Sequence, residues 1–424
     1  MSDQSQIKIN SQFFIVSFLI FMINVVLELY YLFFLSDNFN YLGFKLDFDF
    51  FKFIEIKLLL FLFLVLSWYL YSTSKFLYSI FILLLLFFFI PNSIMFAYMN
   101  SIRGPIYSIA LFLIVFIFIS PFKLAVKTIY TDKYLKSILI LSIALLFLAP
   151  IFILFKFNIN LNTLLLKEIY ETREQFGSKI NSFYSYFYNW EVKIIIPVML
   201  AFFLIARKYL LALFTFTILI YLFVISGNKA VYMTSLVTLF FYFAGGENYV
   251  SKIKLFLLFL LLILIVLPLI DIYILDSFLL RGTFVMRMFF FPALLNYCYF
   301  DFFANTPLYF SENHFFNLIF HSPFDINSAY IISKVYFHAD DMYANNGIIS
   351  DGYMNLGYWG VLILSTLFAL IFMFFNSIKV DTRYFGIFFI LVFFFLSAPM
   401  FTILITGGVW LLFIFAITMM KSKS

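Results

Sequence analysis

The chain has 424 residues, of which 65% are hydrophobic and only 11% are charged. This composition excludes an ordinary soluble domain, in which about a quarter of the residues carry a charge. The formal charge of +6 does not indicate nucleic-acid binding, because a basic excess in a membrane protein is explained first by its cytoplasmic loops. The single cysteine, Cys298, excludes an intrachain disulfide framework and any multi-cysteine metal site.

Long apolar runs recur along most of the chain. A bilayer core of about 30 Å needs about 20 apolar residues in a helix. The runs are apolar all round and do not alternate, which excludes a β-barrel. The first run follows a polar N-terminus without a cleavage motif, so it predicts a retained span and no signal peptide. We therefore predict an all-α, polytopic transmembrane bundle of about twelve spans, at residues 12–35, 55–72, 76–98, 106–121, 137–157, 193–206, 209–226, 230–245, 255–274, 356–377, 384–398 and 400–419.

Basic residues in the short connections predict the orientation of the spans. With both termini in the cytoplasm, every tight cluster of Lys and Arg falls on the cytoplasmic side. The opposite, outer side then receives the two longest loops, residues 158–192 and 275–355. No repeat and no Gly-, Ser- or Pro-rich linker divides the chain, so residues 1–424 are predicted to form one domain.

The first outer loop contains a segment, residues 159–178, that is predicted to form a short amphipathic helix. Arg173 lies on the same face as the apolar residues one and two turns before it, and Gly177 is placed to end the helix. Arg173 is a candidate for binding an anionic head group at the membrane surface. The alternative is a surface arginine that is balanced by Glu171 and Glu174.

Arginine is distributed against the usual bias. The chain has six arginines, and the predicted topology places four of them on the outer side: Arg103, Arg173, Arg281 and Arg287. Positive residues normally gather on the cytoplasmic side, so outer arginines need a separate reason. Bidentate recognition of a phosphate or diphosphate is one that suits the guanidinium group.

The second outer loop begins with Arg281 and Arg287 in apolar sequence, followed by Pro292, which is expected to end or kink their helix. An arginine beside apolar side chains lies near a low-dielectric surface, where it attracts an oxyanion more strongly than in water. The alternative is that one or both arginines pair with a nearby carboxylate, for which the candidates are Asp271, Asp276 and Asp301.

Candidate general bases also lie in this loop. The three histidines, His314, His321 and His338, lack the spacing of a zinc site, so no metal is predicted. A general base for a sugar hydroxyl requires a carboxylate or an imidazole within hydrogen-bond reach. The residues that supply one are His338, Asp340, Asp341 and Asp351, and their spacing does not select among them.

The loop ends in a glycine-rich segment that leads into a span. Four glycines, at positions 347, 352, 357 and 360, permit close backbone approach and a broken or tightly packed helix start. Asp351 lies at the positive N-terminal end of this helix. A carboxylate at this position is either a helix cap or a poised functional group.

Three stretches together resemble a known family: IYETR at 169–173, RMFFFPALLNYCYFDFF at 287–303 and NNGIISDGYMNLGYWGV at 345–361. The sequence resembles the bacterial O-antigen polymerases, the Wzy-type oligosaccharide repeat-unit polymerases, which share a membrane superfamily with the O-antigen ligases. The predicted span count and the two long outer loops agree with that family. The resemblance thus covers most of the chain.

The resemblance implies a GT-C-like, metal-independent glycosyltransferase in the bacterial inner membrane, with its active site in the periplasm and no cofactor. Its substrates would be undecaprenyl-diphosphate-linked oligosaccharides, which it would polymerise into O-antigen for lipopolysaccharide. A chain-length regulator protein is the implied partner. By this transfer Arg173, Arg281 and Arg287 would bind diphosphate, and Asp351, then His338, would activate the acceptor hydroxyl.

Two alternatives remain open. A flippase or other transporter of lipid-linked oligosaccharides would also have about twelve spans, but with short loops and charges inside its spans. In this sequence only Glu28 clearly lies within a predicted span. An O-antigen ligase would perform the same chemistry on a different acceptor, but the related ligases carry a histidine where this chain has Asn346.

Overall fold

The structure, a computed structural model, is helical, and no β-strand occurs among the residues that it describes. The predicted span at 137–157 lies largely outside those residues. The described residues are 2–126, 135, 138–139, 141–142, 159–165, 168–246, 248–313, 316–340 and 342–422.

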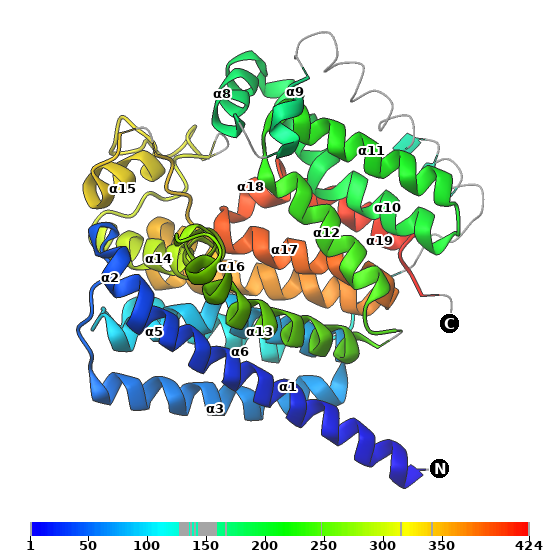
Figure 1. The fold of residues 1–424 in the computed structure, drawn as a ribbon, viewed down its shortest axis with the longest axis horizontal. Helices are drawn as coiled ribbons and strands as arrows, with labels where there is room; N and C mark the ends of the chain where they lie inside the picture. Colours follow the sequence, from blue (N-terminus) through cyan, green and yellow to red (C-terminus); the bar gives the residue numbers. More distant parts are fainter. Residues whose placement is uncertain are drawn as a thin grey trace. The chain divides into compact units, whose positions relative to one another are not determined.

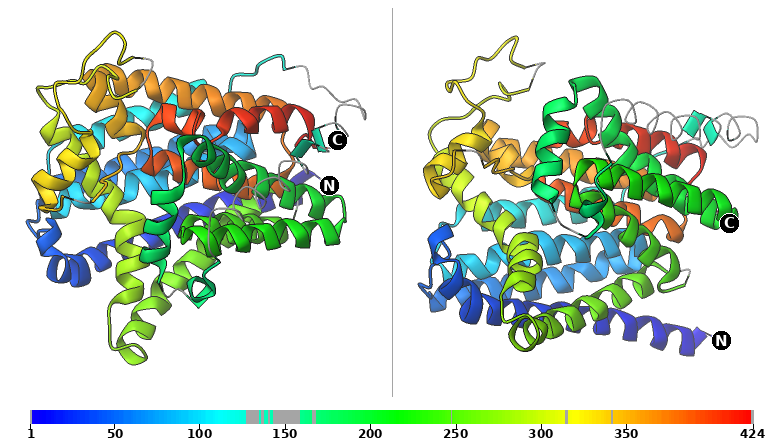
Figure 2. Two further views of the ribbon diagram at one scale, coloured as in Figure 1. Left: turned by 90° about the horizontal axis from the view of Figure 1, so that it is seen from above. Right: turned by 45° about the horizontal axis from the view of Figure 1, so that its top comes forward.

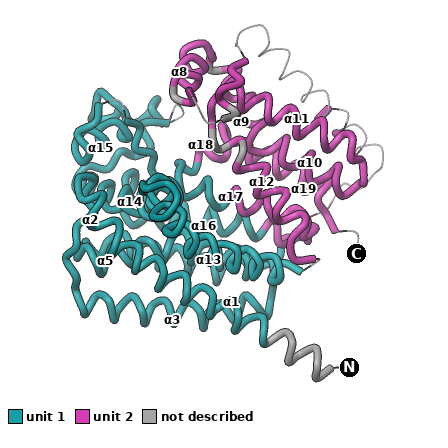
Figure 3. The backbone as a smooth tube through the Cα atoms, in the orientation of Figure 1, with its two compact units in different colours: residues 1–123, 248–373, 392–400 teal, residues 124–247, 374–391, 401–424 magenta. Residues whose placement is uncertain are grey.

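The chain forms two compact units, which are coloured separately in Figure 3. Unit 1 comprises residues 1–123, 248–373 and 392–400. Its α-helices are α1 (Ser2–Tyr30), α2 (Ser36–Asn38), α3 (Phe50–Thr73), α4 (Lys75–Leu84), α5 (Ile90–Tyr98), α6 (Gly104–Ile119), α13 (Tyr249–Tyr273), α14 (Phe291–Phe302) and α15 (Ser328–Phe337). Wider or tighter helical turns form η1 (Tyr31–Leu35), η2 (Asn40–Leu42), η3 (Leu85–Phe89) and η6 (Arg281–Phe290).

Unit 2 comprises residues 124–247, 374–391 and 401–424. Its helical segments are η4 (Leu161–Leu165), α8 (Ile169–Lys179), α9 (Ser182–Trp190), η5 (Glu191–Ile195), α10 (Ile196–Ile205), α11 (Tyr209–Ser226), α12 (Lys229–Phe243), η7 (Thr382–Tyr384) and α19 (Val409–Thr418). Three helices have residues in both units: α16 (Ile348–Ile378), α17 (Phe385–Ser397) and α18 (Met400–Leu404).

Six helices of the described part of the chain are long and apolar enough to cross a membrane: Ser11–Asn38, Lys75–Tyr98, Phe183–Ile205, Tyr209–Ser226, Tyr249–Tyr273 and Ile348–Ile378. Four shorter apolar helices accompany them: Gly104–Ile119, Met233–Phe243, Thr382–Ser397 and Val409–Thr418. The all-α prediction is confirmed, and apolar helices of spanning length agree with a membrane protein. The number of twelve spans stays a prediction.

Side-chain caps and aligned apolar helices build unit 1. Asp49 accepts a hydrogen bond from the Lys52 backbone N–H at 3.0 Å, and this cap starts α3. Ser74 starts α4 in the same way, with the Leu77 N–H at 3.3 Å. Helices α1 and α13 run side by side (Figures 1 and 2). The side chains that these helices bury between them are mostly apolar, and they form part of the core of this unit.

Helix α16 is broken near its start, as the glycine pattern predicts. Leu356 and Gly357 have non-helical backbone angles, and φ of Gly357 is +61°. The chain turns so sharply there that a Cβ on Gly352 would lie 2.8 Å from the carbonyl carbon of Gly360. A Cβ on Gly347 would likewise collide with the backbone carbonyl of Leu396. Glycine at these positions is thus required by close backbone contact, which confirms the prediction.

In unit 2, the amphipathic helix predicted at 159–178 is found in part. The 3₁₀ turn η4 and helix α8 occupy this stretch, but α8 continues through Gly177 to Lys179, so the prediction that Gly177 ends the helix was wrong. Gly227 caps the neighbouring helix α11 with φ of +60°. Its missing side chain lets the carbonyl of Ile169 approach, which sets α8 against the end of α11.

Candidate functional site

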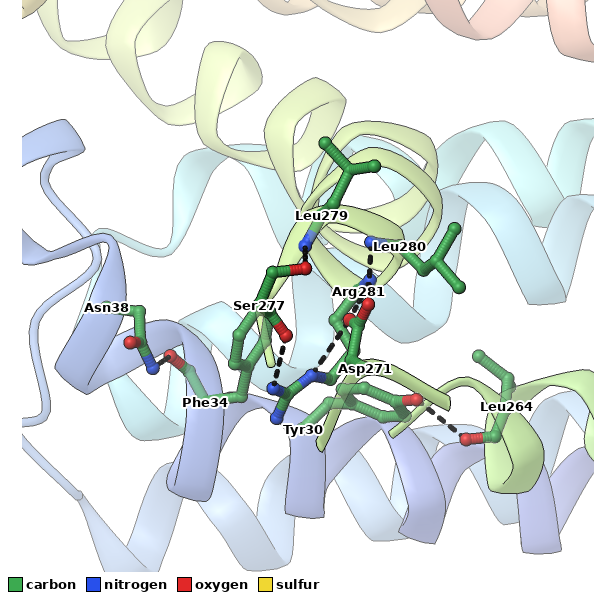
Figure 4. Close-up of polar contacts among 9 residues, drawn as sticks. All are labelled: Tyr30, Phe34, Asn38, Leu264, Asp271, Ser277, Leu279, Leu280 and Arg281. Carbon is green, nitrogen blue, oxygen red and sulfur yellow. Dashed lines mark hydrogen bonds and ion pairs between the residues drawn. The ribbon is translucent and has the colours of Figure 1, made fainter. Parts of the chain in front are cut away.

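The second predicted outer loop contains several helical segments in the structure, and the first of them carries two of the predicted site residues. Arg281 begins the π-helical segment η6, at the position where Asp271 caps it (Figure 4). Asp271 accepts hydrogen bonds from the backbone N–H of Leu280 at 3.1 Å and of Arg281 at 2.8 Å. The same carboxylate pairs with Nε of Arg281 at 3.1 Å. The alternative of an Arg281–Asp271 ion pair is therefore the one that the structure shows.

This ion pair is enclosed. Asp271 has no exposed surface, and the side chain of Arg281 is only 15% exposed. The guanidinium lies over the ring of Phe34, 4.5 Å from its centroid, and Nη2 donates to the carbonyl of Ser277 at 3.4 Å. Much of the hydrogen-bonding capacity of Arg281 is thus taken by the protein itself.

Replacing Arg281 by alanine should destabilise the protein. A loss of activity in this variant would therefore not separate a role in function from a role in stability. Removal of one partner of a buried pair costs about 3–5 kcal/mol, because the other charge stays buried without compensation. The double variant Asp271→Asn with Arg281→Ala should recover part of this loss. Thermal unfolding of the two purified variants measures the difference, and equal melting temperatures for Arg281→Ala and the wild type would contradict this role of the pair.

Arg287 differs from Arg281 because its side chain is exposed. Within the described part of the chain, it has no hydrogen bond and no ion pair to a protein group. Pro292 follows one turn later, where the π-helical segment passes into α14, so the proline marks a change in helix geometry without ending the helix. Arg287 is therefore the predicted arginine of unit 1 whose guanidinium is free to bind an external anion.

The segments that carry Arg287 and His338 contact each other through a pair of phenylalanine rings. Phe291 lies four residues after Arg287, on the same face of the helix and about 6 Å further along its axis. Its ring contacts Phe337, with centroids 5.6 Å apart, and Phe337 precedes His338 directly. His338 ends α15 with φ of +52° and is exposed. An exposed imidazole and an exposed guanidinium thus lie on neighbouring segments.

Asp351 is a buried cap. It is 3% exposed, and its Oδ2 accepts the backbone N–H of Met400 at 2.9 Å, where α18 begins. Its Oδ1 accepts from Nδ2 of Asn355 at 3.0 Å, and Oδ1 of Asn355 accepts the backbone N–H of Phe310 at 2.7 Å. Asp351 thus caps the start of α18 and not, as the sequence allowed, its own helix, and its catalytic role stays a prediction.

Asp351 of α16 lies near the C-terminal end of α14, whereas Arg287 of η6 precedes the start of α14. Asp351 acts electrostatically on Tyr299, near the C-terminal end of α14, and Tyr353 stacks on Phe300 with ring centroids 3.8 Å apart. Arg287 precedes Tyr299 by twelve residues, which is about 18 Å along a helix. A general base must lie about 3 Å from the proton that it removes. Arg287 and Asp351 thus do not form one compact site, whereas the segments that carry Arg287 and His338 contact each other.

Glu312 is a carboxylate that the sequence did not single out. It accepts hydrogen bonds from the backbone N–H of Ser328 at 2.5 Å, from the Ser328 hydroxyl at 2.8 Å and from Nδ2 of Asn327 at 3.2 Å. These bonds hold the N-terminus of α15, the helix that His338 follows directly. Burial raises the pKa of the Glu312 carboxyl, against the bonds from Ser328, which lower it. Nothing in its local sequence distinguishes it from other loop carboxylates.

The raised pKa of Glu312 predicts a pH-dependent contribution to stability. A carboxyl whose pKa is higher in the folded protein stabilises it below the unfolded value of about 4.3, and this contribution is lost as pH rises through the folded pKa. The melting temperature of the wild type, relative to Glu312→Gln, should therefore fall as pH rises from acid to neutral. Glu174→Gln on α8 is the control, and a pH-independent difference for Glu312→Gln would contradict the prediction.

Arg173 belongs to unit 2. Its side chain is exposed, and Nη2 donates to the carbonyl of Gly227 at 3.2 Å. The alternative of pairing with Glu171 or Glu174 does not occur in the structure. Arg173 is thus anchored to backbone with its charge uncompensated by a carboxylate among the described residues, which suits an anion site at the surface of this unit.

The other polar residues of the second predicted outer loop add little to the candidate site. Lys334 pairs with Asp340 at 3.4 Å on the surface, while Asp341 and His314 lie outside the described residues. Burial raises the pKa of the Cys298 thiol to about 12, so this cysteine is not a nucleophile. Asn346 is buried, and its Nδ2 has no partner among the described residues.

Buried charges in the spanning helices are more numerous than the sequence suggested. Glu28 pairs with Lys57 and accepts from Nδ2 of Asn24 at 2.8 Å. Asp271 and Glu191 also lie in helices of spanning length. The prediction that only Glu28 lies clearly within a span was therefore wrong. It failed for Glu191 because the helix that contains it begins at Phe183, ten residues before the predicted start, and for Asp271 because the predicted span 255–274 already contained this residue.

Comparisons of the chain with known protein families, with curated proteins and with solved structures found no match in any of the three.

Proposed function

We propose that this protein is a membrane glycosyltransferase that polymerises oligosaccharide repeat units linked to a polyprenyl diphosphate, as the resemblance to the O-antigen polymerases implies. One observation carries the proposal. Arg287 is an exposed arginine without a protein partner among the described residues, beside apolar helices of spanning length and near the exposed imidazole of His338. This arrangement suits a ligand that is anionic at its head and apolar in its tail.

The reaction assigns a role to each group. The acceptor hydroxyl oxygen attacks the anomeric carbon of the donor sugar, and the bond from that carbon to the lipid diphosphate breaks. The diphosphate leaves with the bonding electron pair, and Arg287 stabilises the charge that develops on it. His338 takes the proton of the hydroxyl. In this proposal His338 replaces Asp351 as the first candidate for the base, because Asp351 is buried and caps α18.

The second unit contributes a further cation. Arg173, with its guanidinium tied to the Gly227 carbonyl, is proposed to bind the diphosphate of a lipid-linked substrate at the surface of unit 2. The proposed location is the bacterial inner membrane, with both termini in the cytoplasm and the site in the periplasm. The proposed partner is a protein that regulates chain length.

Deletion of the gene tests this function through the length of the surface polysaccharide. In a lipopolysaccharide gel, we expect the deletion strain to show core with a single repeat unit, and the complemented strain to show a ladder. A gel without any repeat unit on the core would contradict the proposal and indicate a ligase or a flippase. Accumulation of lipid-linked units in the cytoplasmic leaflet would then identify the flippase.

A transporter of lipid-linked oligosaccharides is the second candidate, and one observation favours it. Glu28, Asp271 and Glu191 are buried carboxylates inside helices of spanning length, and charged groups at membrane depth are typical of transport pathways. Two of the three are paired with a basic residue, which is also typical of a purely structural ion pair. The same gel separates the two candidates.

A further inference from the structure

Glu191 is a buried acid without a partner among the described residues. It has no exposed surface, and neither carboxylate oxygen has a hydrogen-bond partner within the described part of the chain. It begins η5, a π-helical segment between α9 and α10, inside the spanning helix Phe183–Ile205. Buried acids in membrane helices and π-helical turns are both frequent at functional sites.

The surroundings of Glu191 offer no charge to balance it within the described part of the chain. Lys193 lies two residues further, on the opposite side of the helix. The segment η5 packs against α9, α10, α12 and α19. Helices α10 and α19 contain no ionisable residue. Those of α9 and α12 are Tyr184, Tyr186, Tyr188 and Tyr242, together with Lys229 and Tyr232, whose side chains the structure does not describe.

A proton is the ligand that fits this carboxyl. An ionised carboxylate in an apolar interior without hydrogen bonds is strongly disfavoured. A bound calcium or magnesium ion would need about six or more oxygen ligands at about 2–2.6 Å, whereas neither carboxylate oxygen of Glu191 has a hydrogen-bond partner among the described residues. A single carboxyl needs no such cage to bind a proton.

We propose that Glu191 is a proton-binding site within the membrane-spanning part of unit 2, and that its occupancy controls the packing of η5 against α19. The protonated acid stays buried between the helices. Loss of the proton leaves a negative charge on Glu191, which must reach water or a cation. The segment η5 therefore moves away from its neighbours.

Trp190, the residue before Glu191, reports on this packing. Its Nε1 donates to the carbonyl of Ile405 at 2.8 Å, and its ring contacts Trp410 with centroids 5.3 Å apart. A Cβ on Gly408 would lie 2.9 Å from Cδ1 of Trp190. A displacement of η5 must therefore disturb the environment of Trp190.

The test combines infrared and fluorescence titrations of the full-length protein in liposomes, with Trp68 and Trp359 replaced by Phe. We expect the infrared carbonyl band of a protonated carboxylic acid to disappear as pH is raised, together with a shift of tryptophan emission. Other carboxyls, Glu312 among them, also lose a proton in this titration, so the band of Glu191 is the part that is missing from Glu191→Gln. The emission shift should be missing from the same variant, because its amide is neutral at every pH. Glu174→Gln, which changes an exposed carboxylate of the same unit, should retain both.

Two outcomes would overturn the proposal. If the infrared band persists unchanged in Glu191→Gln, Glu191 is not the group that binds the proton. If the band depends on Glu191 but the emission shift is the same in Glu191→Gln, proton binding does not control the packing of η5. Glu191→Leu is a second variant in case glutamine disturbs folding, since leucine also removes the ionisable group and suits an apolar site.

Discussion

Replacing Arg287 by alanine should reduce the product of a complemented deletion strain from a ladder to a single repeat unit, while the melting temperature of the protein stays unchanged. The side chain is exposed and has no protein partner among the described residues, so its removal breaks no internal contact. The loss of one charged donor to a developing oxyanion is expected to slow the reaction by about 10²–10³-fold. Turnover of the purified variants gives this ratio.

Matched variants separate function from stability at this site. Arg287→Lys keeps the charge but loses the bidentate geometry, so it should retain part of the activity. Arg281→Ala should lose activity together with stability, because its partner Asp271 is left buried. His338→Ala should slow turnover without unfolding the protein, since the imidazole is exposed. Wild-type chain lengths from Arg287→Ala would remove Arg287 from the proposed site.

Replacing Gly360 by alanine should prevent folding of the helix break at the start of α16. The added Cβ would collide with the backbone carbonyl of Gly352, and backbone on both sides leaves no flexible side chain to yield. Collisions of this kind belong to the most destabilising class of substitution, above about 4 kcal/mol. We expect little folded protein in detergent-solubilised membranes, measured by size-exclusion chromatography.

Gly177→Ala is the matched control for this prediction. Gly177 lies inside α8, and apart from its chain neighbours and the backbone of its own helix, no atom lies within 4 Å of its added Cβ. Alanine is favoured over glycine in a helix by about 1 kcal/mol, so this variant should be at least as stable as the wild type. A folded, monodisperse Gly360→Ala protein would show that the backbone contact at the break is not required.

The sequence predicted the helical class and the glycine-rich break because both follow from local information. Apolar runs of spanning length are visible in the chain itself, and a cluster of glycines before a span is typical of close backbone contact. The helix boundaries were predicted less well. The span predicted at 193–206 begins at Phe183 in the structure, so Glu191 lies within the helix. The polar stretch before it is rich in tyrosine, and the boundary therefore could not be read from apolar residues alone.

The partners of the site residues could not be predicted, because they depend on the folded chain. The sequence offered three carboxylates for Arg281, and only the turn after α13 selects Asp271. It left Asp351 as either a cap or a catalytic group, and it did not indicate the bond from the N–H of Met400, 49 residues away. Glu312 became notable only through its bonds to the start of α15, which no local pattern indicates.

The most direct test of the proposed function is turnover by the purified protein. Reconstituted in liposomes with a polyprenyl-diphosphate-linked repeat unit from the same strain, the protein is expected to produce a ladder of lipid-linked oligomers and to release polyprenyl diphosphate, whereas Arg287→Ala yields neither. If the wild type leaves the repeat unit intact and only moves it across the bilayer, the protein is a transporter and the proposed glycosyltransferase activity is contradicted.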